Sequence, residues 1–123
     1  MLSIIIPTRN EEHYLPFLLD SITSKNSEFT DYEIIIADGN SQDRTREIAR
    51  NSACKVVLGG LPAQGRNAGA KIAKGELFLF LDADVVLPSG FFSHIFSEFQ
   101  KKKLSIASFP LFPKGKTIDS FFF

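Results

Sequence analysis

An apolar run that ends abruptly at two carboxylates is the feature that most constrains this sequence. Residues 77–81 read Leu-Phe-Leu-Phe-Leu, and Asp82 and Asp84 follow directly. A short, entirely apolar segment of this kind is typical of a strand buried on both faces of a parallel sheet. In open α/β sheets, ligands bind just beyond the carboxyl ends of such strands. The run therefore predicts a buried strand with a binding site at its end.

Asp82 and Asp84 lie on the same side of the chain if the extended geometry continues past the strand. Two like charges at this spacing repel each other unless a cation or a shared proton compensates them. Carboxylate oxygens suit Mg²⁺ or Mn²⁺, and such an ion can neutralise a departing diphosphate. A polar strand end without a ligand is the alternative, because Asp-x-Asp triplets are common by chance. The context favours a metal and nucleotide site with both carboxylates as ligands.

Apolar strand patterns alternate with helix patterns along the chain. The predicted strands cover residues 2–6, 32–37, 55–58, 77–81 and 105–109, and the predicted helices cover about 8–24, 43–51, 66–74 and the residues from 88 onward. Alternation at this spacing requires right-handed crossovers and a mainly parallel sheet. The predicted fold class is a Rossmann-like three-layer α/β/α domain, with helices on both faces of the sheet.

Composition sets few further limits. With 123 residues the chain can form one domain with a buried core. Lysine plus arginine and aspartate plus glutamate number 14 each, so charge points neither to nucleic acid nor to an anionic membrane surface. The single cysteine, Cys54, excludes an internal disulfide and fits a reducing compartment. No run reaches the length of a membrane span, so we expect a cytoplasmic protein, free or at the cytoplasmic face of a membrane.

Polar residues that can bind a nucleotide follow the first two predicted strands and lie at the start of the third predicted helix. Arg9 and Glu11 can contact a phosphate and a hydroxyl or base edge, beside free amides at a helix start; ordinary capping and solvation is the alternative. Asp38 can accept hydrogen bonds from a base or ribose, or simply form an Asx turn. Gly65 is expected to precede a helix and let backbone approach a ligand, while Arg66 offers a planar donor fork to a diphosphate; the alternative is that the glycine and alanine residues here only permit close helix packing.

Four motifs in order resemble the family 2 glycosyltransferases of the GT-A fold. They are Ile-Ile-Ile-Pro-Thr-Arg-Asn-Glu-Glu at 4–12, Ile-Ile-Ile-Ala-Asp-Gly-Asn-Ser-Gln-Asp at 34–43, Gly-Arg-Asn-Ala-Gly-Ala at 65–70 and Leu-Phe-Leu-Asp-Ala-Asp at 79–84. The resemblance covers about the first 90 residues. It implies a nucleotide-diphosphate sugar, usually UDP-linked, whose sugar passes with inversion to an acceptor hydroxyl deprotonated by a carboxylate.

The resemblance also implies roles for individual residues. It places Pro7, Glu11 and Asp38 near the uridine, Arg66 near the nucleotide, Asp82 near the ribose or diphosphate, and Asp84 on the Mg²⁺ or Mn²⁺ ion. The acceptor, whether saccharide, lipid or protein, is left open by the motifs.

The part of the family that lies downstream of the Asp-x-Asp motif has no clear counterpart here. Family members carry the catalytic base and the acceptor-binding surface in that region. After Asp84 the only carboxylates are Glu98 and Asp119, neither in a recognisable base motif, and the chain has no tryptophan. We therefore expect residues 1–123 to be a single, incomplete donor-binding domain, truncated before the acceptor part. The terminal residues 121–123, all phenylalanine, suggest docking on a partner or peripheral membrane association.

Two other interpretations fit part of the pattern. Haloacid-dehalogenase-like phosphatases also have a strand that runs into Asp-x-Asp, as at Asp82 and Asp84, but their later lysine and paired-aspartate motifs are missing and they do not explain the upstream loops. The second is a non-enzymatic nucleotide-binding or assembly fragment that docks through its phenylalanine-rich end.

Overall fold

Strands and helices alternate throughout residues 1–102, the part of the chain that the structure, a computed structural model, describes. The strands are β1 (Leu2–Thr8), β2 (Tyr32–Asp38), β3 (Lys55–Leu58) and β4 (Leu77–Phe80), and the helices are α1 (Leu15–Thr23), α2 (Thr45–Asn51), α3 (Pro62–Ile72) and α4 (Phe91–Lys102). The strand predicted at 105–109, Asp119 and the phenylalanine-rich end lie outside the described residues.

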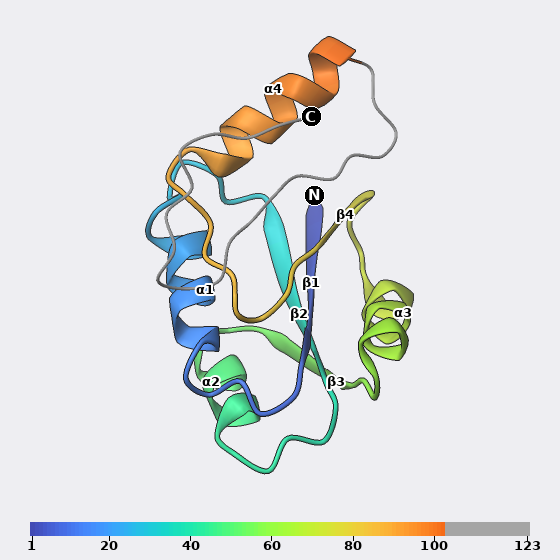
Figure 1. Cartoon of the computed structure of the whole chain (residues 1–123). Helices are drawn as coiled ribbons and strands as arrows, with labels where there is room; N and C mark the ends of the chain where they lie inside the picture. Colours follow the sequence, from blue (N-terminus) through green and yellow to red (C-terminus); the bar gives the residue numbers. More distant parts are fainter. Residues whose placement is uncertain (103–123) are drawn as a thin grey trace.

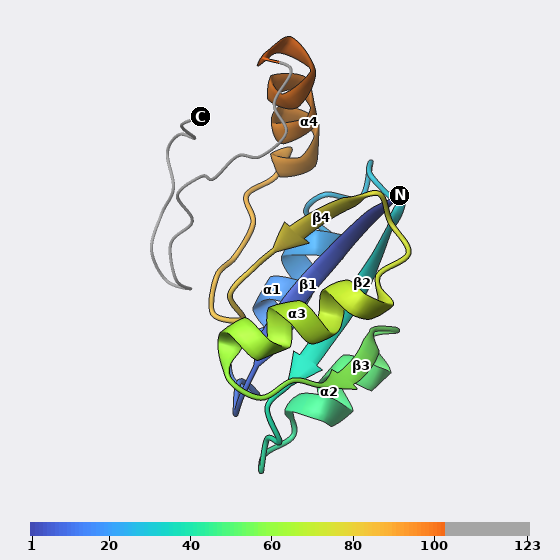
Figure 2. The same ribbon diagram turned by 90° about the vertical axis from the view of Figure 1, so that its right-hand side faces the viewer.

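The four described strands form one parallel sheet in the order β3-β2-β1-β4. β1 pairs with β2 from Leu2 opposite Tyr32 to Thr8 opposite Asp38. The strand order reverses at β1, because β2 and β3 lie on one side of it and β4 lies on the other. Helices α1 and α2 cover one face of the sheet and α3 covers the opposite face (Figures 1 and 2). The predicted three-layer α/β fold with a parallel sheet is confirmed.

Side chains of β1 alternate between the two layers, as a strand requires. Ile4 and Ile6 are completely buried in the core cluster beneath α1, together with Leu15 and Leu18. Ile5 is equally buried but faces α3, where Gly69 lies against it. Both faces of the central strand are therefore covered, which explains its unbroken run of isoleucines.

Helix α4 packs at the amino ends of the strands, at the edge of the sheet opposite to Asp38 (Figure 1). Its Phe92 and Phe96 rings each lie 5.0 Å from the ring of Phe29, measured between centroids. Phe92 also stacks on Tyr32, the first residue of β2. Within residues 1–102, none of the helices combines the length and apolar character needed to cross a membrane.

The prediction that the strand before Asp82 is buried on both faces is wrong. In β4 only Leu79 is buried, whereas Leu77, Phe78 and Phe80 are each about half exposed. The reason is position, since β4 is an edge strand of the described sheet and α3 packs mainly on β1, β2 and β3. An all-apolar run does not reveal whether both of its faces find a partner.

Two helix starts differ from the prediction by four residues or more. Helix α1 begins at Leu15 rather than at about residue 8, because Thr8 still belongs to β1 and Asn10 has a positive φ of 53°. Helix α3 begins at Pro62, four residues before the predicted start at 66, with the Gln64 side chain accepting the Leu61 N–H at 2.9 Å. Gly65 therefore lies inside this helix, not before it.

The Glu33 side chain links the amino-terminal ends of three strands through hydrogen bonds. The Glu33 carboxylate, only 10% exposed, accepts hydrogen bonds from Ser3 Oγ (2.6 Å), Lys55 Nζ (2.7 Å) and the Lys74 N–H (2.6 Å). Burial alone would raise the pKa of Glu33, but these donors together lower it to about 2. One carboxylate thus joins β1, β2, β3 and the segment after α3.

We predict that Gly69→Ala destabilises the fold although alanine favours helices. A Cβ at this position would lie 2.5 Å from Cγ2 of Ile5, a stiff β-branched side chain that is fully buried. Overpacking of this kind costs about 1–3 kcal/mol in the free energy of unfolding, measurable by urea denaturation. Asn67→Ala, on an exposed turn of the same helix, is the control and should be neutral. Equal stability of the two variants would contradict the packing described.

Glu33→Gln should destabilise the protein in a pH-dependent way. Because the pKa of Glu33 is lowered in the folded state, its contribution is complete above the unfolded value of 4.5 and is lost as pH falls toward about 2. We expect a loss of about 1–3 kcal/mol at pH 7 that shrinks at pH 3. The exposed Glu28→Gln is the matched control. A wild-type-minus-variant difference that does not change with pH would refute this role of the carboxylate.

Candidate functional site

The carboxyl end of β1 is the point where neighbouring strands diverge. Pairing of β1 with β4 ends at Ile5 opposite Phe80, with the Leu81 N–H donating to the Ile5 carbonyl at 3.1 Å. The next residue of β1 that faces this side is Pro7, because facing alternates along a strand, and proline has no N–H to donate. The chain after Leu81 is therefore free to leave β1. This is the switch point at which α/β sheets bind ligands.

Asp38 ends β2 next to this point, and its carboxylate is turned into the protein. The side chain is 2% exposed. Oδ1 accepts from Thr8 Oγ1 (2.8 Å) and Ser41 Oγ (2.6 Å), and Oδ2 accepts from the Ser41 N–H (2.8 Å) and lies 3.7 Å from Arg46 Nε. A carboxylate has about four lone-pair positions, so neighbours within the chain already use those of Asp38.

The segments after β1 and β2 are joined by a second set of hydrogen bonds. Three successive backbone N–H groups of the first segment donate to side chains of the second: Asn10 to Ser41 Oγ (2.9 Å), Glu11 to Thr45 Oγ1 (2.8 Å) and Glu12 to Asp43 Oδ2 (3.2 Å). In return, the Gln42 and Arg44 N–H groups donate to Asn10 Oδ1 and to the Glu12 carboxylate. The prediction that amides here are free to bind an anion is therefore wrong.

Glu11 brings the segment after β1 close to the two aspartates that follow β4. Burial raises the pKa of Glu11, and the negative charges of Asp84, Asp43 and Asp82 raise it further. Asp84 is half-buried and Asp82 is exposed. No ion pair within residues 1–102 involves either aspartate. The site therefore concentrates negative charge that a bound cation would neutralise.

These carboxylates do not form a complete metal site by themselves. In the described part of the chain, no group of three or more His, Cys, Asp or Glu side chains is arranged to hold a metal ion. Mg²⁺ is usually bound by only one or two carboxylates, the remaining ligands being water and phosphate oxygens. Asp82 and Asp84 fit that kind of binding, and do not fit a cage built from protein ligands alone.

Helix α3 places Arg66 beside the same edge of the sheet. Gly65 lies against β1 and β2, since a Cβ on it would be 3.2 Å from Cβ of Pro7 and 3.4 Å from Cβ of Ala37. Arg66 is the next residue and is half-buried, whereas Arg9, directly after β1, is exposed. The structure thus gathers the predicted residues at one edge, with Asp38 inside and Arg9 at the surface.

Sequence reasoning missed the partners of Asp38. Ser41 could have been found, because the turn cluster Asp-Gly-Asn-Ser favours side-chain hydrogen bonds to nearby backbone. Thr8 was predicted to start a helix, while the structure places it at the end of β1, opposite Asp38. Arg46 gave no signal, because its approach to Asp38 depends on where α2 begins.

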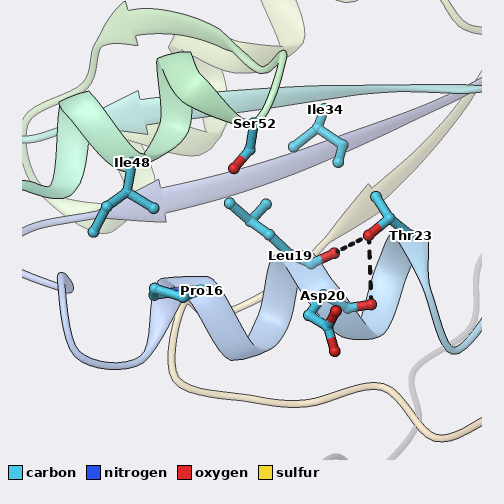
Figure 3. Close-up of a pocket in the computed structure, with 7 residues that line it drawn as sticks. All are labelled: Pro16, Leu19, Asp20, Thr23, Ile34, Ile48 and Ser52. Atoms are coloured by element: carbon cyan, nitrogen blue, oxygen red, sulfur yellow. Dashed lines mark hydrogen bonds between the residues drawn. The ribbon is translucent and has the colours of Figure 1, made fainter.

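A separate groove of about 340 Å³ lies between α1 and α2 (Figure 3). Its lining residues are Pro16, Leu19, Asp20, Thr23, Ile34, Ile48 and Ser52. Thr23 Oγ1 donates back to the helix carbonyls of Leu19 and Asp20. The groove contains none of the predicted site residues.

Comparison with known proteins gives a consistent set of relatives. The sequence profile described as Glycosyl transferase family 2 matches residues 3–120. Poly(ribitol-phosphate) beta-N-acetylglucosaminyltransferase TarS of Staphylococcus aureus is 34% identical over 90 residues, covering 67% of this chain and 16% of TarS. Poly(ribitol-phosphate) beta-glucosyltransferase of Bacillus spizizenii is 37% identical over 92 residues, covering 68% of this chain and 14% of that protein. The chain thus spans less than a fifth of these relatives.

Solved structures show the same relationship. The crystal structure of S. aureus TarS 1–349 is 31% identical with a TM-score of 0.70, covering 81% of this chain and 32% of that one. TarS 1–349 has also been solved with UDP and with UDP-GlcNAc. Glucosyl-3-phosphoglycerate synthase from Mycobacterium tuberculosis, in complex with Mn²⁺ and UDP, has a TM-score of 0.58 at 23% identity, covering 81% of this chain and 39% of that one. At that identity the likeness concerns the fold alone.

We predict that Thr8→Val destabilises the fold by about 1–3 kcal/mol, because it removes a donor from the buried Asp38 carboxylate without changing side-chain volume. Urea denaturation measures the loss. Thr30→Val, at an exposed position, is the control and should stay within about 0.5 kcal/mol of wild type. If both variants were as stable as wild type, Asp38 would not depend on this hydrogen bond.

Proposed function

Because the chain belongs to glycosyl transferase family 2, we propose that it forms the donor-binding part of an enzyme that uses a nucleotide-diphosphate sugar, most simply a UDP-sugar. The observation that carries this proposal is the group of Glu11, Asp82 and Asp84 at the switch point of the sheet, where the two aspartates have no cationic partner among the described residues. TarS, 31% identical in structure comparison, has been solved with UDP-GlcNAc. That precedent favours uridine over other bases.

In this proposal the nucleoside lies over the ends of β1 and β2, near Pro7, Glu11 and the inward-facing Asp38. The diphosphate lies toward Arg66, whose planar guanidinium can donate two parallel hydrogen bonds to phosphate oxygens. Arg9, exposed after β1, adds a positive charge at the rim. Helix α3 supplies a rigid base for Arg66, since Gly65 fixes it against Pro7 and Ala37.

Asp84 and Asp82 would hold a Mg²⁺ or Mn²⁺ ion, which neutralises charge on the diphosphate as it leaves. Asp84 is the more enclosed ligand and Asp82 the more exposed one. Burial and the negative charges of Asp84, Asp43 and Asp82 raise the pKa of Glu11, and a cation bound here would offset the charge repulsion. Phosphate oxygens and water would complete the coordination.

Transfer of the sugar to an acceptor hydroxyl, with inversion, needs a carboxylate base that the described residues do not supply. Glu98 is the only carboxylate between Asp84 and residue 102, and it pairs with Lys102 at 3.3 Å on α4. That helix packs on Tyr32 at the opposite edge of the sheet. We therefore assign residues 1–102 to donor binding, and place acceptor binding and the base outside these residues. Saccharide, lipid and protein acceptors are all compatible with this assignment.

Calorimetric titration with UDP tests the proposal. Wild-type protein should bind UDP more tightly with Mn²⁺ or Mg²⁺ than without a metal. Asp84→Asn should weaken the metal-dependent binding by about tenfold or more, because the substitution removes a charged ligand. Asp20→Asn is the matched control, since Asp20 is an exposed aspartate on α1 beside the separate groove. Folding of each variant is checked by its thermal unfolding transition.

A folded wild-type chain that binds neither UDP nor GDP with any metal would overturn the donor-site assignment. If metal-dependent binding of UDP is unchanged in Asp84→Asn, the assignment of the metal to Asp84 is wrong, whereas the assignment of the nucleotide site stands. The two results separate the nucleotide assignment from the metal assignment.

A further inference from the structure

Arg46 makes two contacts whose purpose the donor site as described does not explain. Its Nη2 donates to the Ser41 carbonyl at 3.0 Å, and its Nε lies 3.7 Å from Asp38 Oδ2. The Arg46 side chain is 43% exposed, while that of Asp38 is 2% exposed. The partly exposed guanidinium of Arg46 therefore lies between the buried Asp38 carboxylate and solvent.

The contacts of Arg46 continue through the protein to the residues assigned to the nucleoside. Asp38 accepts from Thr8, the residue after Pro7, and from Ser41. Ser41 Oγ in turn accepts the N–H of Asn10, the residue before Glu11. Each link is a hydrogen bond of 2.6–2.9 Å between buried or partly buried groups. Arg46 is thus one contact away from Asp38 and Ser41 and two contacts away from segment 8–10.

We propose that Arg46 is a positioning residue of the donor site, which fixes Asp38 and Ser41 and through them the surface that contacts the nucleoside. This inference rests on the proposed function. Arginine suits the task because its rigid, planar fork engages a carboxylate and a carbonyl at once, whereas lysine offers a single point charge. Asp38 then acts mainly by holding Thr8 and Ser41 in place.

The effect of Arg46 should be confined to the nucleoside end of the donor. Arg46 belongs to α2, whereas Arg66 belongs to α3 on the opposite face of the sheet, and Asp82 and Asp84 follow β4 (Figure 2). None of the hydrogen bonds or ion pairs of Arg46 involves these three residues. Its removal should therefore change recognition of the base more than recognition of the diphosphate.

Comparison of UDP with ADP distinguishes recognition of the base from recognition of the diphosphate, because the two nucleotides share ribose and diphosphate and differ only in the base. The full chain and its Arg46→Gln and Arg46→Lys variants are titrated with each nucleotide in the presence of Mn²⁺. We expect Arg46→Gln to raise the Kd for UDP by about five- to tenfold, as for loss of a charged hydrogen bond. The Kd for ADP should stay within about twofold, and Arg46→Lys should be intermediate for UDP. Arg44→Gln is the control, since exposed Arg44 pairs only with Glu47 through its guanidinium (3.0 Å).

Three results would overturn the proposal. The first is an unchanged Kd for UDP in a folded Arg46→Gln variant, and the second is an equal loss of UDP and ADP binding. The third is loss of the cooperative unfolding transition in both variants, which would make Arg46 a folding residue. Failure of wild-type protein to bind UDP would instead refute the proposed function, so the two failures are distinguishable.

Discussion

The carboxylate of Asp38 is buried at the end of β2, and the arrangement of two loops depends on it. A buried charge is costly unless it is paired and hydrogen-bonded, and here Thr8, Ser41 and Arg46 together supply those partners. Since the partners come from β1, from the turn after β2 and from α2, satisfying one charge fixes all three segments. The hydrogen bonds between segments 10–12 and 41–45 extend the same unit. The two loops are thus held together by hydrogen bonds within the protein itself.

The segment after β4, on the other side of β1 from Asp38, carries negative charges that are not paired within the described residues. Asp82 and Asp84 follow β4, which separates from β1 where Pro7 offers no further N–H. Their charges act on Glu11, whose pKa is raised by burial and by these neighbours. The charge of Asp38 is paired with Arg46, whereas Asp82 and Asp84 form no ion pair among residues 1–102. In the proposed donor site, a metal ion between these aspartates and a diphosphate would neutralise this charge.

Local patterns predicted the strands well and the helix starts poorly. The strand at 55–58 is found at the predicted residues, and the isoleucine runs of β1 and β2 read correctly because apolar periodicity is a local property. The start of α1 was misplaced because the amides of residues 10–12 are capped by side chains more than 30 residues away. Likewise, the exposure of β4 and the approach of Arg46 to Asp38 depend on tertiary neighbours. That these residues would lie together at one end of the sheet was predictable, but their hydrogen-bond partners were not.

The central claim is that a divalent metal and a nucleotide bind together at the switch point of the sheet. Nuclear magnetic resonance of the isotopically labelled chain tests it directly, because Mn²⁺ broadens the amide signals nearest to it. With UDP present, replacing Mg²⁺ by Mn²⁺ should broaden the signals of residues 9–12 and 82–85 first and leave those of α4, at the far edge of the sheet, sharp. Broadening centred on α4, or spread evenly over the chain, would contradict the account.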